Sequence, residues 1–148
     1  SHNVPTVGQM TGMSCWVVSG GLATGRMTSA LPGGADVDPT NGGLNLSMDN
    51  VQQWASSLNM RLVHNPPATI EGIEPLIRRG PVILVGKWIA GGAHAVVISG
   101  YYAGPTAYAK MLRINNSLPM GRGCIQITDY PSIMLGQQGM TAFALLTR

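Results

Sequence analysis

This sequence is poor in charge and in aromatic side chains, and both shortages narrow the class of protein it can be. Charged residues make up 10% of the 148 residues and aromatic residues 5%, whereas hydrophobic residues make up 45%. A chain this apolar folds rather than remaining disordered. The net charge is only +3, and no cluster of Lys and Arg exceeds the pair Arg78-Arg79. We therefore expect no nucleic-acid partner.

Long apolar runs and a targeting signal are also missing. No apolar segment reaches the ~18–20 residues that cross a bilayer, so we expect no membrane partner. The first residues, Ser1-His2-Asn3 onward, lack the basic and apolar stretches of a signal peptide. No spacing of His, Cys and carboxylate residues suits zinc, and we expect neither a metal nor a cofactor.

Cysteine is scarce too, with only Cys15 and Cys124. An even count permits one disulfide, but a single bridge is a poor framework for a domain of this size. We favour a free thiol at Cys15, because its surroundings suit a nucleophile, and a small apolar role in a strand for Cys124.

A cysteine nucleophile needs a base, a group that orients the base, and donors for the oxyanion that develops on the attacked carbonyl. The sequence offers all of these. Cys15 follows Ser14 and begins a predicted helix. The helix N-terminus and a nearby imidazolium together would lower the pKa of the thiol to well under 7. His94 is the candidate base, Asn115 or Asn116 the candidate orienting group and Gln9 the candidate oxyanion donor. Asn115 is the rival to Asn116, because adjacent residues of a strand point to opposite faces and only one can reach His94.

These residues, taken with their neighbours, resemble the papain-like cysteine peptidases of clan CA. Gln9 and the run Ser14-Cys15-Trp16 resemble the glutamine and the nucleophile motif of that family, His94-Ala95 its histidine strand, and Asn116-Ser117 its asparagine motif. The opening of the chain looks closest to the compact bacterial branch, which includes secreted effector proteases. Two features depart from full-size members. The interval from Cys15 to His94 is far shorter than their ~130–150 residues, and Leu118 stands where a tryptophan usually shields the asparagine–histidine pair.

The resemblance implies a cysteine endopeptidase with a Cys15–His94–Asn116 triad, acting on a protein or peptide substrate. It also implies a bacterial effector or toxin that is secreted or delivered into a target cell, acts in its cytoplasm and contributes to interbacterial competition. Such toxins usually have a cognate immunity or inhibitor protein, and the chain would then be the toxin domain of a longer secreted protein. Two other functions remain open. The same triad can serve a glutamine deamidase, a transglutaminase or a peptidoglycan-stem amidase, and the fold can serve as a non-catalytic binding module.

The chain reads as a single α+β domain spanning residues 1–148. Apolar periodicity and capping residues predict helices over 15–28, 47–57 and 69–80. A short strand is expected at 61–64, followed by β-rich runs at 82–89, 94–102, 107–115, 123–128 and 139–147. We expect a papain-like arrangement, with the N-terminal helical half packed on a C-terminal antiparallel sheet half and the active-site cleft between them.

Overall fold

The computed structural model of the protein describes residues 2–5, 15–24, 47–88, 93–102, 111–117, 121–130, 132 and 140–148. Within these residues the chain forms, in order, α1 (Cys15–Thr24), α2 (Met48–Ser57), β1 (Arg61–Val63), α3 (Ile70–Arg79), β2 (Val82–Trp88), β3 (Ala93–Tyr101), β4 (Met111–Asn116), β5 (Cys124–Asp129) and β6 (Met140–Thr147). The predicted elements are present, with ends that differ by a few residues. The predicted end of the first helix and the first residues of the predicted strand at 107–115 lie outside the described residues. None of the described helices is long and apolar enough to cross a membrane.

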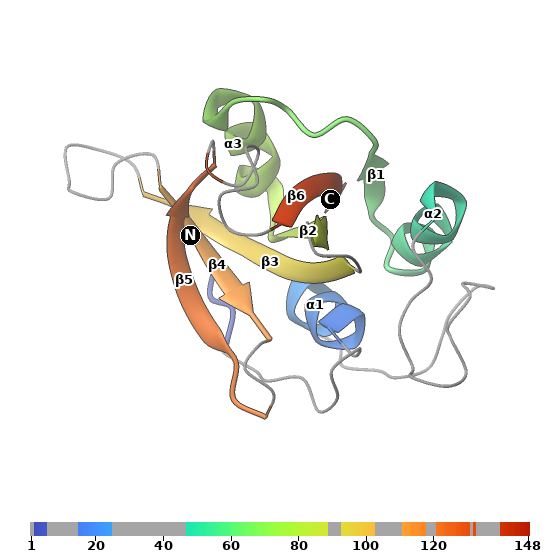
Figure 1. Cartoon of the computed structure of the whole chain (residues 1–148), viewed down its shortest axis with the longest axis horizontal. Coiled ribbons are helices and arrows are strands. Elements are labelled where there is room, and N and C mark those ends of the chain that lie inside the picture. The colour runs from blue at the N-terminus through green and yellow to red at the C-terminus, as the bar shows by residue number, and fades with distance from the viewer. Residues whose placement is uncertain are drawn as a thin grey trace.

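One six-stranded sheet organises the fold, with the strand order β1-β6-β2-β3-β4-β5. Every neighbouring pair is antiparallel. The C-terminal strand β6 lies between β1 and β2, so the short strand from the helical part of the chain becomes an edge of the sheet (Figure 1). Helices that precede a block of antiparallel strands make an α+β protein, and this prediction is confirmed.

Helices cover both faces of this sheet. Ile83 and Val85 of β2 belong to a buried cluster with residues of α1 and α2, whereas Val82 and Leu84 belong to a second cluster with α3. Alternate residues of a strand point to opposite faces, so α1 and α2 lie on one face and α3 on the other (Figure 1). The helical layer opposite α1 was not foreseen from the sequence.

The helix ends follow the sequence signals with one exception. The Ser47 hydroxyl accepts a hydrogen bond of 3.1 Å from the backbone N–H of Asn50, which satisfies one of the free donors at the start of α2. Thr69 occupies the same position before α3, but its side chain makes no capping hydrogen bond. Pro75 lies inside α3. α3 therefore depends on its buried residues Ile73 and Ile77 more than on its cap.

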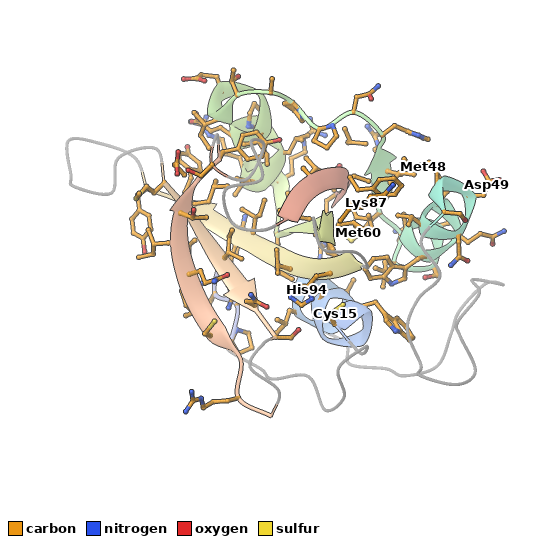
Figure 2. The ribbon with its side chains drawn as sticks, in the orientation of Figure 1. Cys15, Met48, Asp49, Met60, Lys87 and His94 are labelled. Carbon is orange, nitrogen blue, oxygen red and sulfur yellow. The ribbon has the colours of Figure 1, made fainter. Side chains whose placement is uncertain are left out.

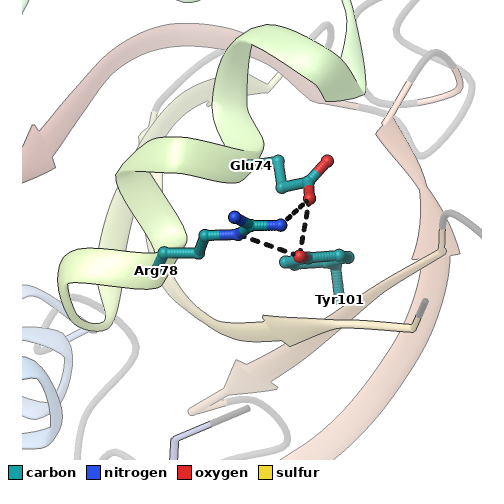
Figure 3. Close-up of polar contacts among 3 residues, drawn as sticks. All are labelled: Glu74, Arg78 and Tyr101. Carbon is teal, nitrogen blue, oxygen red and sulfur yellow. Dashed lines mark hydrogen bonds and ion pairs between the residues drawn. The ribbon is translucent and has the colours of Figure 1, made fainter.

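A polar cluster on the outside of the molecule joins α3 to the end of β3 (Figure 3). The Glu74 carboxylate accepts hydrogen bonds from the Tyr101 hydroxyl at 2.6 Å and from Arg78 Nη2 at 2.7 Å. Arg78 Nε also donates to the Tyr101 hydroxyl at 3.2 Å. The Tyr101 hydrogen bond, with a smaller contribution from Arg78, lowers the pKa of Glu74. Because these groups are exposed to solvent, we expect them to add little to stability.

Candidate active site

Cys15 is the first residue of α1 and is half-buried against the strand that carries His94. Burial raises the pKa of its thiol, although hydrogen bonds from the backbone of Ala95, Trp16 and Cys15 itself act in the opposite direction. The expectation of a thiol pKa well under 7 is therefore wrong for the protein in this state. The loss of water around the sulfur outweighs the donors at the helix N-terminus, because burial disfavours the charged thiolate.

His94 is the second residue of β3, and only 4% of it is exposed. Its ring nitrogen Nε2 lies 2.7 Å from Oδ1 of Asn116 on the neighbouring strand β4. Burial lowers the pKa of His94, and the hydrogen bond to Asn116 opposes that shift in part. The neutral ring is thus favoured, in a fixed orientation.

The partner of Nε2 also sets the tautomer of the ring. A carbonyl oxygen can only accept a hydrogen bond, so Nε2 of His94 carries the proton that points at Asn116. In the neutral ring the other nitrogen, Nδ1, is then the proton acceptor. Burial thus raises the pKa of Cys15 and lowers that of His94, so it favours the neutral form of each side chain over its charged form. A neutral thiol and a neutral imidazole are suited to general-base activation of the thiol as it attacks.

The two adjacent asparagines make different contacts on opposite sides of β4. Asn115 is 2% exposed, and its Nδ2 donates to the backbone oxygens of Val4 at 3.1 Å and Pro5 at 3.0 Å. Its Oδ1 accepts hydrogen bonds from Ser99 at 2.7 Å and from Arg113 at 3.2 Å. Asn115 therefore fastens the N-terminal segment to the sheet, and Asn116 is the asparagine that meets His94.

Gln126 of β5 is a further residue at this site that the sequence did not single out. Its Oε1 accepts a hydrogen bond of 3.1 Å from Nδ2 of Asn116. This contact favours the amide orientation in which Oδ1 of Asn116 faces His94. The strand register shows how the two meet, since Cys124 pairs with Asn116 and Gln126 is two residues further along the same face. Only the β4–β5 pairing, which the sequence does not specify, brings them together.

The remaining predicted residues are placed as follows. Figure 2 shows the Cys15 side chain at the start of α1, labelled close to His94 in this view, and the Cys15 thiol hydrogen-bonds the backbone of Ala95, the residue that follows His94. Trp16 is buried in the core. Gln9, the predicted oxyanion donor, lies outside the described residues, as does Leu118.

Both cysteines are free, so the alternative of a disulfide between Cys15 and Cys124 is excluded. Among the described residues, no group of three or more His, Cys, Asp or Glu side chains could hold a metal ion. The described site thus consists of a thiol, an imidazole and two amides.

Comparison with known protein families identifies the family of the chain. The model of the family described as "Papain-like cysteine protease AvrRpt2" matches residues 1–120, which include Cys15, His94 and Asn116. The chain belongs to this family. This papain-like cysteine protease is therefore a cysteine-type peptidase, a hydrolase. No curated protein matches the sequence. β5 and β6 follow the matched range, so Gln126 belongs to a part of this protease that the family match does not include.

Proposed function

We propose that this papain-like protease is an endopeptidase in which Cys15 is the nucleophile, His94 the general base and acid, and Asn116 the residue that orients His94. The observation that carries this proposal is the 2.7 Å hydrogen bond between His94 Nε2 and Asn116 Oδ1. This hydrogen bond leaves Nδ1 as the basic atom of the His94 ring. His94 lies on β3, and Cys15 contacts β3 through the backbone of Ala95. The three residues also lie within the range that the family matches.

In the proposed reaction, the Cys15 sulfur attacks the carbonyl carbon of the scissile peptide while the thiol proton passes to Nδ1 of His94. The resulting imidazolium donates that proton to the leaving nitrogen, the carbon–nitrogen bond breaks, and a thioester to Cys15 remains. Water then attacks the thioester and gives a proton to His94. The carboxylic acid leaves, and the thiol takes its proton back. Asn116 holds the ring through both proton transfers and is a better partner for the imidazolium than solvent, because the ring is buried.

Two donors are proposed for the oxyanion that forms in each half of the reaction. They are the backbone N–H of Cys15, at the first position of α1, and the side-chain amide of Gln9. Removal of one such donor typically lowers turnover by about 10²–10³-fold. The expected papain-like placement of a substrate cleft between the helical part and the sheet belongs to this proposal, with α1 and β3 as its two walls at Cys15.

The biological setting is also a proposal. We infer that the protease is an effector or toxin that is delivered into a target cell, cleaves a protein there and is held inactive beforehand by a cognate immunity protein. The family match and the compact Gln9–Trp16 opening support this setting. When the protease is expressed in the producing cell and purified, the inhibitor should be isolated with it. The inhibitor should bind the wild type and Cys15→Ala equally well if it covers the site without reacting with the thiol.

Product mass tests the proposed reaction directly. The purified protease is incubated with folded and unfolded protein mixtures, and the products are weighed by mass spectrometry. Backbone fragments that Cys15→Ala does not produce are the expected result. A gain of 1 Da on an intact substrate would instead identify a glutamine deamidase with the same triad. Equal cleavage by the wild type and Cys15→Ala would refute the assignment of Cys15.

A further inference from the structure

Strand β3 has one stretch that pairs with a neighbouring strand on one side only. β2 pairs with β3 from Ala93 to Ile98, but the described pairing of β4 with β3 begins only at Val97. Ala95 therefore lies where β3 extends beyond β4. Backbone donors and acceptors at such a place need partners other than a neighbouring strand if they are buried, and Ala95 is 4% exposed.

Helix α1 supplies those partners from two positions one turn apart. The Ser19 hydroxyl donates a hydrogen bond of 3.0 Å to the carbonyl oxygen of Ala95. The backbone of Ala95 also hydrogen-bonds the Cys15 thiol, and because this bond favours the thiolate, the Ala95 N–H is the donor. The N–H and C=O of one strand residue point the same way, so a single residue can bind both side chains of the helix.

The chain positions involved connect this contact to the reacting groups. Ser19 follows Cys15 by four residues, which puts both on the same face of α1. Ala95 immediately follows His94. Ser19 is 2% exposed, so its hydroxyl has little access to water as an alternative partner to Ala95.

We propose that Ser19 is a positioning residue: its hydrogen bond to Ala95 fixes the register of α1 against β3 and so sets the Cys15 thiol against His94. The inference rests on the proposed function, because it presumes that Cys15 and His94 react together. The hydrogen bond of Ser19 is to the backbone of Ala95 and not to the side chain of Cys15 or His94. Ser19 acts through the helix and through the backbone of Ala95.

The proposal is tested by measuring how far the reactivity of Cys15 depends on His94, with and without the Ser19 hydroxyl. All variants carry Cys124→Ser, so that iodoacetamide labels Cys15 alone. The alkylation rate is measured from pH 5 to pH 9 for the background protein, Ser19→Ala, His94→Ala and the double variant, in a double-mutant cycle. Thr24→Val is the matched control, because it removes a hydroxyl-to-carbonyl hydrogen bond of 2.7 Å whose acceptor, Gly20, belongs to α1 itself.

We expect Ser19→Ala to lower the alkylation rate near pH 7 by about 10-fold or more, since small misplacements of reacting groups are costly. It should have little further effect once His94 is absent. Thr24→Val should leave the rate unchanged, and Ser19→Thr, which keeps the hydroxyl, should restore it. If Ser19→Ala does not fold, the cycle is run with Ser19→Thr and Ser19→Val, which differ only in that hydroxyl.

Two results would overturn the inference, and they are distinguishable. Equal effects of Ser19→Ala in the presence and absence of His94 would show that Ser19 contributes only to the fold. A rate that does not change on His94→Ala in the otherwise unaltered protein would refute the proposed Cys15–His94 pair itself. The inference about Ser19 would then be refuted with it.

Discussion

The two neighbouring asparagines of β4 should differ in what their substitution affects, one mainly the stability of the protein and the other mainly the reactivity of its site. Asn115 and Asn116 have the same side chain, but Asn115 makes four hydrogen bonds in a buried setting. Asn116 makes one to His94 and one to Gln126, and it is half-exposed. We expect Asn115→Ala to cost mainly stability and Asn116→Ala to cost mainly reactivity.

The magnitudes follow from these contacts. A hydrogen bond contributes about 1 kcal/mol, and a buried partner left without one costs about 1–3 kcal/mol, so Asn115→Ala should lower the free energy of unfolding by roughly 3–5 kcal/mol. In a domain of this size that corresponds to a melting temperature lower by about 10 °C. Asn116→Ala leaves one buried partner, His94, and one exposed partner, Gln126, so it should cost about 1–3 kcal/mol, less than Asn115→Ala. Because Asn116→Ala also removes the hydrogen bond that orients the imidazole of His94, it should lower the rate at which iodoacetamide alkylates Cys15 by about 10- to 100-fold.

The assay is calorimetry together with iodoacetamide labelling of Cys15 in a Cys124→Ser background, at a temperature where every variant is folded. Alkylation passes through no oxyanion, so Gln9 and the N-terminal segment that Asn115 fastens do not influence the rate. The reasoning is refuted if Asn115→Ala slows alkylation as much as Asn116→Ala does. A larger loss of melting temperature at Asn116 than at Asn115 would refute it equally.

Two further predictions concern pH and backbone space. The pKa of His94 is lower in the folded protein, so the unfolded chain takes up a proton first and stability should fall as the pH drops below about 6.5. The pKa of Cys15 is higher in the folded protein, so the unfolded chain loses its proton first and stability should fall as the pH rises above about 8.5. Unfolding by urea across this range should show both losses, the first diminished in His94→Gln and the second in Cys15→Ser. Alanine usually stabilises a helix relative to glycine by up to about 1 kcal/mol, but a Cβ at Gly72 would lie 2.5 Å from the Cβ of Pro67. Gly72→Ala should therefore lower the melting temperature, whereas Gly20→Ala, whose Cβ would meet its nearest neighbour at 3.4 Å, should not.

The order of helices and strands could be predicted from the sequence because each element carries its own local signal. Ser47 and Gly80 mark the start of α2 and the end of α3, and both elements lie within a residue or so of the predicted ends. The face of the sheet that each helix covers could not be predicted in the same way. The run from Val82 to Val85 is apolar at every position, which is typical of a strand covered on both faces, but nothing in it specifies which helix covers which face.

The candidate site shows the same division between local and tertiary information. Motif spacing singled out Cys15, His94 and Asn116 along the chain. The choice between Asn115 and Asn116 depends on the register of β3 against β4, and Gln126 depends on β5 as well. The direction of the Cys15 pKa shift was wrong because a helix N-terminus is visible in the sequence, whereas the burial that outweighs it is a property of the folded protein.

Ser19 was also overlooked, although a signal for it exists. It stands four residues after the nucleophile, on the same helical face, in a helix whose residues between Cys15 and Thr24 are otherwise apolar or glycine. A polar residue in that position needs a buried partner, and the carbonyl of Ala95 is that partner. The sequence alone indicates the need for a partner but not its identity.

The measurement that tests the central claim most directly is a comparison of newly formed protein N-termini in cells expressing the wild type, Cys15→Ala or Cys124→Ala. The two cysteines are both free and half-exposed, which makes Cys124→Ala a matched control. The account predicts the same set of new N-termini for the wild type and Cys124→Ala, and none of that set for Cys15→Ala. New N-termini that persist in Cys15→Ala, or that are lost in Cys124→Ala alone, would contradict it.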